Sequence, residues 1–359
     1  MPSATFVVET LKNRLRQGDY RVRSFPAARK LAEELGVSRQ TVSKAVRQLV
    51  AEGHLAQMQN GRISLRPRLP TAVKHLAIVT PSYPEPILID LYNAIKTLVA
   101  EASWEVKAVH YSHWRDPVIS DAISGMDGVF FLPFAEDFPA DVVRLLQSAG
   151  KVVVIERDLS AQGLPSLQIL PPSFVGKLLD QAGCAARGAV ACLNTQPMDA
   201  AIRARIDHWR LWSALHRVEG PLFNHPVKAT RSAADHARQV FRELLEDGGL
   251  EGVRSLFCTT TAAAFGAMRA MADCGLRPGA DLSVCSADSG FGMARNSIPS
   301  LTCLFNPPMA PFIRLCLDWI AAPDQPWPGT LLMQPTDVPV FLGESTGQGA
   351  PPRCLPAKP

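Results

Sequence analysis

The first fifty residues carry apolar side chains at helical spacing, with glycines between the apolar stretches. This pattern predicts helices over 6–16, 26–35 and 38–52. Gly36 closes the second helix, because glycine readily adopts the left-handed conformation in which helices end. Ser38 is a natural N-cap for the third, since its hydroxyl can accept a free backbone N–H of the first turn.

The third predicted helix has two contrasting faces and is followed by a predicted hairpin. Its apolar stripe consists of Val42, Ala45, Val46, Leu49 and Val50, and Gln40, Ser43, Lys44 and Arg47 lie opposite. Two short strands are predicted over 54–59 and 62–66, around Asn60-Gly61, a dipeptide typical of tight hairpin turns. Two helices joined by a tight turn and followed by a hairpin form a winged helix-turn-helix, whose third helix enters the DNA major groove.

The polar residues of this region therefore form a candidate DNA-binding surface. Arg39, Gln40 and Thr41 follow the cap Ser38 in the first helical turn, from which side chains reach base edges. Lys44 and Arg47, one and two turns later, are placed for phosphates or further bases. Arg62 follows Asn60 and Gly61 in the predicted wing. A solvated helix face is the alternative for each of these residues taken singly.

Beyond residue 75 apolar strands alternate with amphipathic helices. Strands are predicted over 76–80, 106–109, 128–132, 152–155, 189–193, 254–258 and 282–286. Helices are predicted over 88–102, 142–146, 173–186, 205–216, 233–246 and 262–273. Such alternation indicates parallel sheets covered by helices, and about 270 residues exceed what one sheet of this kind needs, so two lobes are expected.

The domain boundaries and the charge agree with this division. The expected division is a DNA-binding domain at 1–68, a linker at 69–75, a two-lobed body at 76–345 and a disordered tail at 346–359. Residues 1–70 hold 13 Lys and Arg against 5 Asp and Glu, whereas the other 289 hold 24 basic and 28 acidic residues. A basic head on a mildly acidic body indicates a nucleic-acid-binding module joined to a part that does not bind nucleic acid.

Several function classes are excluded by what the sequence does not contain. No apolar run approaches the roughly 18 residues of a membrane span. There is no G-x-S-x-G elbow, P-loop or G-x-G-x-x-G after a strand, and His110 and His113 have no third ligand at a recognisable spacing. The eight cysteines form no C-x-x-C pair, and we interpret them as reduced, buried thiols of a cytoplasmic protein. We expect no enzyme, no metal and no cofactor.

Residues 5–66 resemble the GntR-type winged-helix domain of bacterial repressors. The matching features are Phe-Pro-x-x-Arg at 25–29, Leu-Gly-Val-Ser-Arg-x-Thr-Val at 35–42, Ala45, Leu49 and Glu-Gly at 52–53. The resemblance implies that Arg29 and Arg39 contact DNA, with Gln40, Thr41 and Gly61 close to it. The family usually has serine where Ala27 stands, and loss of that cap should cost on the order of 1 kcal/mol.

Residues 75–345 are similar to repressors of the lactose- and galactose-repressor kind, whose bodies share the periplasmic-binding-protein fold. The likeness rests on the segments 126–132, 150–158, 263–276, 277–288 and 299–302. It implies an effector site between the lobes, formed by Ser82, Phe134, Arg157, Asp158, Arg203, Arg205, Trp209, Thr260, Thr261 and Asp288. GntR-type heads on such bodies occur in repressors of the arabinose-repressor kind.

Departures from the residues of that family leave the identity of the ligand open. Its sugar-binding Asn-Asp pair is Thr260-Thr261 here, and its second-lobe Asp-Asn pair is Leu170-Pro171. Either Arg203 or Arg205 matches the arginine that grips the ligand. The ligand is therefore a sugar, a less polar molecule, or none. Two alternatives remain open for particular residues: Trp209 and Trp212 stack on a ligand ring or pack in a helix interface, and Asp288 binds ligand or caps the next turn.

The sequence thus predicts an α/β protein with an N-terminal winged helix-turn-helix and a two-lobed periplasmic-binding-protein-like body. We expect a transcription regulator, a repressor, that binds double-stranded DNA at a palindromic operator as a homodimer and responds to a small-molecule effector. The alternative is a DNA-binding protein whose body serves only dimerisation or protein docking.

Overall fold

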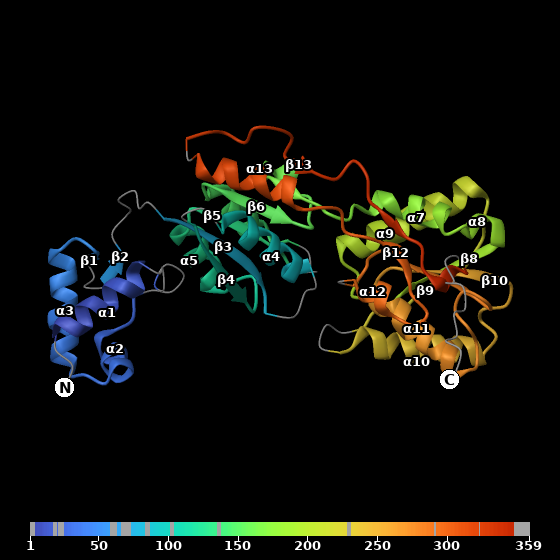
Figure 1. Cartoon of the computed structure of the whole chain (residues 1–359), viewed down its shortest axis with the longest axis horizontal. Helices are drawn as coiled ribbons and strands as arrows, with labels where there is room; N and C mark the ends of the chain where they lie inside the picture. Colours follow the sequence, from blue (N-terminus) through green and yellow to red (C-terminus); the bar gives the residue numbers. More distant parts are fainter. Residues whose placement is uncertain are drawn as a thin grey trace, which may run out of the picture.

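The chain forms a small helical domain followed by two α/β lobes (Figure 1). The computed structural model describes residues 4–16, 20, 25–57, 63–65, 73–82, 87–100, 104–134, 138–227, 231–290, 292–322 and 324–347. The predicted wing residues Asn60, Gly61 and Arg62, most of the predicted linker and residues 348–359 lie outside this description.

The N-terminal domain contains the elements expected of a winged helix-turn-helix. They are α1 (Ala4–Arg16), α2 (Ala28–Leu35), α3 (Arg39–Ala51), β1 (Leu55–Gln57) and β2 (Ile63–Leu65). The strands pair antiparallel, with Leu55 opposite Leu65. The apolar faces of the three helices meet in one core, in which Val7, Leu11, Leu31, Val42, Ala45, Leu49 and Leu55 are all fully buried. The apolar positions predicted from helical spacing therefore pack together in the core of this domain.

The first lobe is a parallel sheet with helices on both faces. The strand order is β13-β7-β6-β5-β3-β4. The strands are β3 (Lys74–Pro81), β4 (Trp104–Tyr111), β5 (Gly128–Phe131), β6 (Val152–Ile155), β7 (Ser166–Leu167) and β13 (Leu332–Met333). Alternate residues of β3 face opposite ways: Leu76 and Ile78 share a core with α4 (Ile87–Val99) and α13 (Ala310–Ala321). Ala77 and Val79 share another with α5 (Pro117–Gly125) and α6 (Ala140–Ser148).

The second lobe repeats this architecture. Its order is β14-β12-β11-β10-β8-β9, parallel except that β14 runs antiparallel to β12. The strands are β8 (Ala189–Asn194), β9 (Leu222–Asn224), β10 (Val253–Cys258), β11 (Ser283–Ser286), β12 (Thr302–Leu304) and β14 (Val340–Phe341). One face packs on α7 (Val175–Gln181), α8 (Cys184–Arg187) and α9 (Ala200–His216), the other on α10 (Ala233–Glu246), α11 (Thr261–Asp273) and α12 (Met293–Asn296).

The chain crosses between the lobes three times. It leaves the first lobe after β7, returns after β12 to place α13 and β13 on the first lobe, and leaves again towards β14 (Figure 1). The segments that connect the lobes follow directly after the carboxyl ends of β7, β12 and β13. The other parallel strands of each sheet run in the same direction as these. The carboxyl ends of the parallel strands in both sheets therefore meet at the junction of the lobes, which is where open α/β sheets bind ligands.

The structure corrects several details of the sequence-based prediction. The helix predicted over 173–186 is broken into a 3₁₀ turn (Pro172–Phe174), α7 and α8, because Gly183 adopts φ 67° between the last two. β3 begins at Lys74, inside the predicted linker. Thr346, assigned to the tail, is buried and hydrogen-bonds Thr302. Six of the seven cysteines among the described residues are buried, but Cys274 is exposed.

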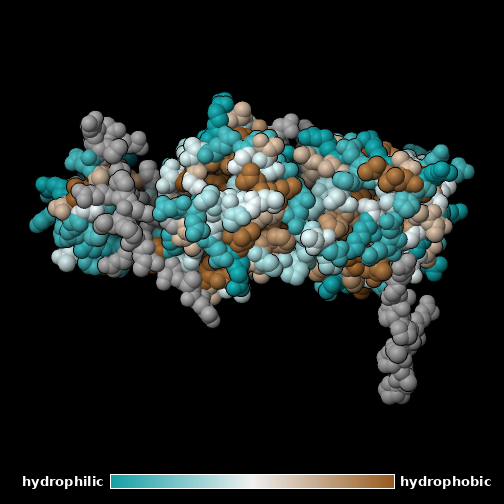
Figure 2. Space-filling model, turned by 90° about the horizontal axis from the view of Figure 1, so that it is seen from above, coloured by the Kyte–Doolittle hydropathy of each residue, from teal (hydrophilic) through white to brown (hydrophobic). Residues whose placement is uncertain are grey.

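The surface agrees with the charge pattern of the sequence. Seen from above, hydrophilic residues dominate the described surface of the N-terminal domain, and apolar residues form scattered patches on the lobes (Figure 2). Within the described residues, none of the helices has the length and apolar character needed to cross a bilayer.

Candidate functional site

The helix-turn-helix is held together by local hydrogen bonds. Gly36 adopts the left-handed conformation, φ 63°, and its N–H donates to the carbonyl of Ala32, which ends α2. Ser38 then caps α3, because its Oγ accepts the N–H of Thr41 at 3.1 Å. Both predictions made from these residues are confirmed. Ala27, which precedes α2, supplies no side-chain cap, as expected of alanine.

The outer face of α3 presents the predicted polar residues to solvent. Arg39, Gln40, Lys44 and Arg47 are exposed, and Thr41 is half-buried. On α2, the side chain of Arg29 is 83% exposed, and its Nε lies 4.0 Å from Glu33 Oε1. These exposed cations can reach phosphates, whereas the Ser38 hydroxyl is occupied by its capping bond. A basic, solvated helix face beside a tight turn is suited to the DNA major groove.

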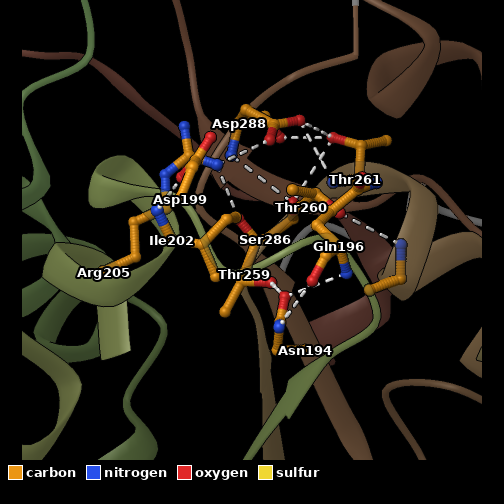
Figure 3. Close-up of polar contacts among 11 residues, drawn as sticks. Asn194, Gln196, Asp199, Ile202, Arg205, Thr259, Thr260, Thr261, Ser286 and Asp288 are labelled. Carbon is orange, nitrogen blue, oxygen red and sulfur yellow. Dashed lines mark hydrogen bonds and ion pairs between the residues drawn. The ribbon is translucent and has the colours of Figure 1, made fainter. Parts of the chain in front are cut away.

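At the junction of the lobes Asp288 is the centre of a polar network (Figure 3). Its Oδ1 accepts the backbone N–H of Thr261 at 3.1 Å and also the hydroxyl of Thr261. Its Oδ2 lies 3.2 Å from Arg205 Nη1, which also donates to the carbonyl of Thr259 at 2.7 Å. The Asp288 side chain is 24% exposed and that of Arg205 14% exposed.

The carboxylate of Asp288 thus does two things at once. It caps α11, because Thr261 is the first residue of that helix, and it neutralises Arg205. The capping alternative for Asp288 concerned the turn that follows it, whereas the helix that it caps precedes it in the chain. Thr260 contributes the ordinary N-cap, accepting the N–H of Ala263 at 3.4 Å.

The two candidate arginines lie in different surroundings. Arg205 points to Asp288, whereas Arg203 is exposed and donates to the carbonyl of Met198. Beside them a second network joins Asn194, Gln196, Thr259 and Asn224: Asn194 Oδ1 accepts from Thr259 Oγ1 at 2.8 Å. It lies at the carboxyl ends of β8, β9 and β10, next to Asp288 (Figure 3).

The remaining predicted residues lie at the carboxyl ends of the first lobe's strands. Ser82, exposed after β3, donates its N–H to the carbonyl of Tyr111. Phe134, after β5, packs edge-on against Tyr111 and Trp114. Asp158 caps a turn, because its Oδ1 accepts hydrogen bonds from the backbone N–H and from the hydroxyl of Ser160. Arg157 lies half-buried after β6.

Trp209 belongs to the protein core. It is 4% exposed and packs with Ile206, Trp212 and Leu178 in the cluster that joins α9 to α7. Of the two roles open to this residue, the structure favours helix packing over contact with a ligand ring. Its neighbour Trp212 donates Nε1 to Asp180 at 2.7 Å, which is also a packing role.

One residue at the junction escaped the sequence analysis. Glu156 follows the apolar strand β6, is half-buried, and accepts the N–H of Ile169 at 2.8 Å. Burial raises the pKa of its carboxyl group to about 7, against smaller lowering effects of the Ile169 N–H and of Arg205. A charged residue at the end of four buried apolar residues, Val152 to Ile155, was the available signal.

Comparisons with known proteins agree with both halves of this description. Residues 3–63 match the family model "Bacterial regulatory proteins, gntR family". The N-terminal domain is a GntR-type helix-turn-helix domain. The chain is accordingly a DNA-binding transcription regulator, and the families it is similar to are regulators rather than enzymes. No curated protein matches the chain.

The body of this GntR-headed regulator has the fold of LacI-family effector domains. It is similar to a LacI family regulator from Mycobacterium smegmatis, at 14% identity and TM-score 0.61, covering 75% of this chain and 98% of that one. A regulator from Arthrobacter sp. FB24 in complex with lactose has 15% identity, TM-score 0.59 and coverages of 76% and 99%. A LacI family regulator from Enterococcus faecium with bound ribose has 16% identity and a TM-score of 0.59, and the match covers 75% of this chain and 97% of that one.

Among the described residues, no group of three or more His, Cys, Asp or Glu side chains is arranged to hold a metal ion. The Nδ1 atom of His110, a residue considered above as a metal ligand, lies 2.9 Å from the hydroxyl oxygen of Thr80.

Proposed function

We propose that the chain is a repressor whose operator affinity is controlled by a small molecule bound between its lobes. The observation that carries this proposal is the Arg205–Asp288–Thr261 network at the carboxyl ends of the second lobe's strands, opposite Glu156 and Arg157 of the first. A ligand with hydroxyl groups can replace the hydrogen bonds of this network. The two relatives found with lactose and ribose support a sugar or a related polar molecule as the ligand class.

The proposed response couples the two halves of the chain. A ligand that favours one arrangement of the lobes changes the spacing of the two DNA-binding domains in a homodimer. Operator affinity then changes by no more than the ligand's differential affinity for the two arrangements. The dimer binds a palindromic operator in double-stranded DNA, because two symmetric heads meet two symmetric half-sites. We place this activity in the cytoplasm.

A second candidate has its own supporting observation. The polar groups of Thr259, Thr261, Arg205 and Asp288 already satisfy one another. A body without an effector would keep such a network permanently and would serve only dimerisation or protein docking.

A thermal-shift screen of the full chain with sugars, polyols and nucleosides separates the two candidates. A ligand present at 100 times its Kd raises the free energy of unfolding by about 2.7 kcal/mol if it binds only the folded state. We expect at least one sugar-like compound to raise Tm and to change operator binding in a gel shift. If no compound of these classes raises Tm, the docking function is favoured.

A further inference from the structure

Arg205 is held in place through one of its terminal nitrogens. Its Nη1 donates to two acceptors, the carbonyl of Thr259 at 2.7 Å and Oδ2 of Asp288 at 3.2 Å (Figure 3). Thr259 is itself fixed, because its hydroxyl donates at 2.8 Å to Oδ1 of the fully buried Asn194. Two acceptors on one nitrogen fix the plane of the guanidinium group, so the direction of its other N–H groups is set before a ligand binds.

The opposite edge of the same guanidinium group has no acceptor. Among the described residues, no hydrogen bond or ion pair reaches Nε or Nη2 of Arg205. Both atoms are accessible, since the fully buried side-chain nitrogens without a partner in this part of the chain belong to Trp114 and Trp209. The Nε and Nη2 N–H groups point the same way and form the edge that pairs with both oxygens of a carboxylate. Arg205 therefore presents a free two-donor edge, although its side chain is only 14% exposed.

The positive charge of Arg205 is only loosely paired with Asp288. Their contact is 3.2 Å long, whereas charge-assisted N–H···O bonds are typically about 2.7–2.9 Å. The Asp288 carboxylate also accepts the N–H and the hydroxyl of Thr261 at the N-terminus of α11, a position that stabilises a negative charge by itself. An acceptor that carries its own negative charge therefore binds the free edge of Arg205 more strongly than a neutral hydroxyl group does.

Neighbouring carboxyl groups of the chain do not occupy this edge. Asp199, which lies beside Arg205 in Figure 3, is engaged as the N-cap of α9, where its Oδ1 accepts the N–H of Ile202 at 2.7 Å. On the first lobe, Oε1 of Glu156 accepts the N–H of Ile169 at 2.8 Å. Among the described residues, the edge is thus left for a group from outside the chain.

We propose that the ligand of the junction is a polyhydroxy acid, such as a uronate or an aldonate, whose carboxylate pairs with Nε and Nη2 of Arg205. This inference rests on the proposed function, because it names the chemical class of the molecule bound at the same site. Arg205 contacts the ligand, whereas Thr259 is a positioning residue that keeps the free edge of Arg205 in its direction. A neutral sugar can use the same edge, but it forms no ion pair there.

Isothermal titration calorimetry of the full chain with matched acids and neutral compounds tests the ligand class. The pairs are D-glucuronate with D-glucose, D-galacturonate with D-galactose, and D-gluconate with D-glucitol, all titrated at the same ionic strength. We expect at least one acid to bind with a Kd about tenfold or more below that of its neutral partner. This comparison uses the wild-type chain alone, so it does not depend on the folding of any variant.

Three variants then test the residues. Arg205→Lys keeps the positive charge but loses the planar edge, so the preference for the acid should disappear. Arg210→Lys is the matched control, because Arg210 lies on the same helix, is exposed and pairs with Asp207, and it should keep the preference. Thr259→Val removes the hydroxyl that Asn194 holds but keeps the carbonyl that accepts from Arg205, so it should weaken binding of the acid more than binding of its neutral partner.

The contrary outcomes separate this inference from the proposed function. Neutral sugars that bind as tightly as their acids overturn the ligand class but leave the effector function in place. If neither kind of compound binds, the inference fails, and the thermal-shift screen decides whether the effector function fails with it. A preference that survives in Arg205→Lys, or is lost in Arg210→Lys, overturns the role given to Arg205. Equal weakening of acid and neutral compound in Thr259→Val overturns the positioning role of Thr259.

Discussion

Asp288 shows how one side chain at the junction carries several contacts. It accepts hydrogen bonds from the backbone and the hydroxyl of Thr261 and pairs with Arg205, while a quarter of its side chain remains exposed. Removing a partly buried carboxylate that neutralises an arginine costs more stability than removing one partner of a surface pair, because the arginine is left without a counter-charge. The same exposure leaves room for a ligand to reach it.

Asp288→Asn separates ligand binding from capping. The asparagine oxygen can still accept the N–H of Thr261, but its amide cannot neutralise Arg205. We expect the ligand-induced rise in Tm and the operator response to be lost, while DNA binding without ligand stays unchanged. Thermal-shift and gel-shift titrations of both proteins measure this. A variant that loses stability and DNA binding equally but keeps its ligand response would show that Asp288 is only a cap.

Glu156→Gln should alter the pH dependence of stability. The pKa of Glu156 rises from 4.5 in the unfolded chain to about 7 in the fold. Between these values the folded state retains a proton that the unfolded state has released, so the free energy of unfolding falls as pH rises. Glutamine does not titrate, so the variant should gain on the wild type from pH 5 to pH 8, by at most about 3 kcal/mol. Urea unfolding at both pH values checks this, and a constant difference would argue against the raised pKa.

Arg39→Ala tests the DNA-binding face at its first exposed residue. If the guanidinium pairs with a guanine, specific operator binding should weaken by about 1–3 kcal/mol. Arg62→Ala, in the predicted wing, should weaken binding to all sequences alike and lower the salt slope by about one. Gel-shift titrations at several salt concentrations distinguish the two effects. Unchanged specific binding in Arg39→Ala would mean that this turn does not enter the groove.

At the scale of the elements, local signals explain where most helices begin and end. α3 begins after its serine cap and α2 ends at its left-handed glycine, as the sequence predicts. α10 spans Ala233–Glu246, the predicted range, because Ser232 caps it through the N–H of Asp235. Packing between elements follows different rules. α10 and α11 approach closely at Gly266, where a Cβ atom would overlap the carbonyl of Ala234.

Gly266→Val tests that close approach. The added side chain would collide with the backbone of α10, which is not free to move, so we expect a loss of about 1–3 kcal/mol or more. Ala272→Val places the same side chain on the exposed part of the same helix, where the loss should stay below about 0.7 kcal/mol. Urea unfolding of both variants gives the comparison. Equal losses would show that the two helices can separate without cost.

At the scale of the whole molecule, the DNA-binding domain and the proposed effector-binding body are separate parts of the chain. The N-terminal domain has its own buried core, and the lobes share a continuous core that runs through the crossings, including Ile169, Met309 and Val338. The second lobe also exposes apolar side chains, with Ile298 97% and Met293 52% exposed. The proposed homodimer would bury some of these side chains against a second copy of the body.

The proposed function predicts that the body dimerises without DNA. We expect residues 70–359 to sediment as a dimer, whereas residues 1–68, small and highly charged, should be monomeric and bind half-sites weakly. Analytical ultracentrifugation at tens of micromolar decides this, with the full chain as reference. A monomeric body at that concentration would contradict the proposed homodimer and the palindromic operator with it.

Elements that depend only on neighbouring residues could be predicted from the amino-acid sequence. The apolar stripe of α3, the cap at Ser38, the glycine after α2 and the buried strands such as β6 follow from local periodicity and backbone preferences, so they were predictable. The GntR-type motif covers the same local region. The break of α7 from α8 at Gly183 was missed, because a glycine within a helical pattern does not always end the helix.

Which residues meet at the junction of the lobes depends on how distant elements pack together. Arg203 and Arg205 are two residues apart on one helix, and the choice between them depends on where α9 lies against Thr259 and Asp288, 54 and 83 residues further along. The return of α13 to the first lobe likewise depends on contacts distant in the chain. Periodicity carries no information about such contacts, because they arise only when separate elements pack together.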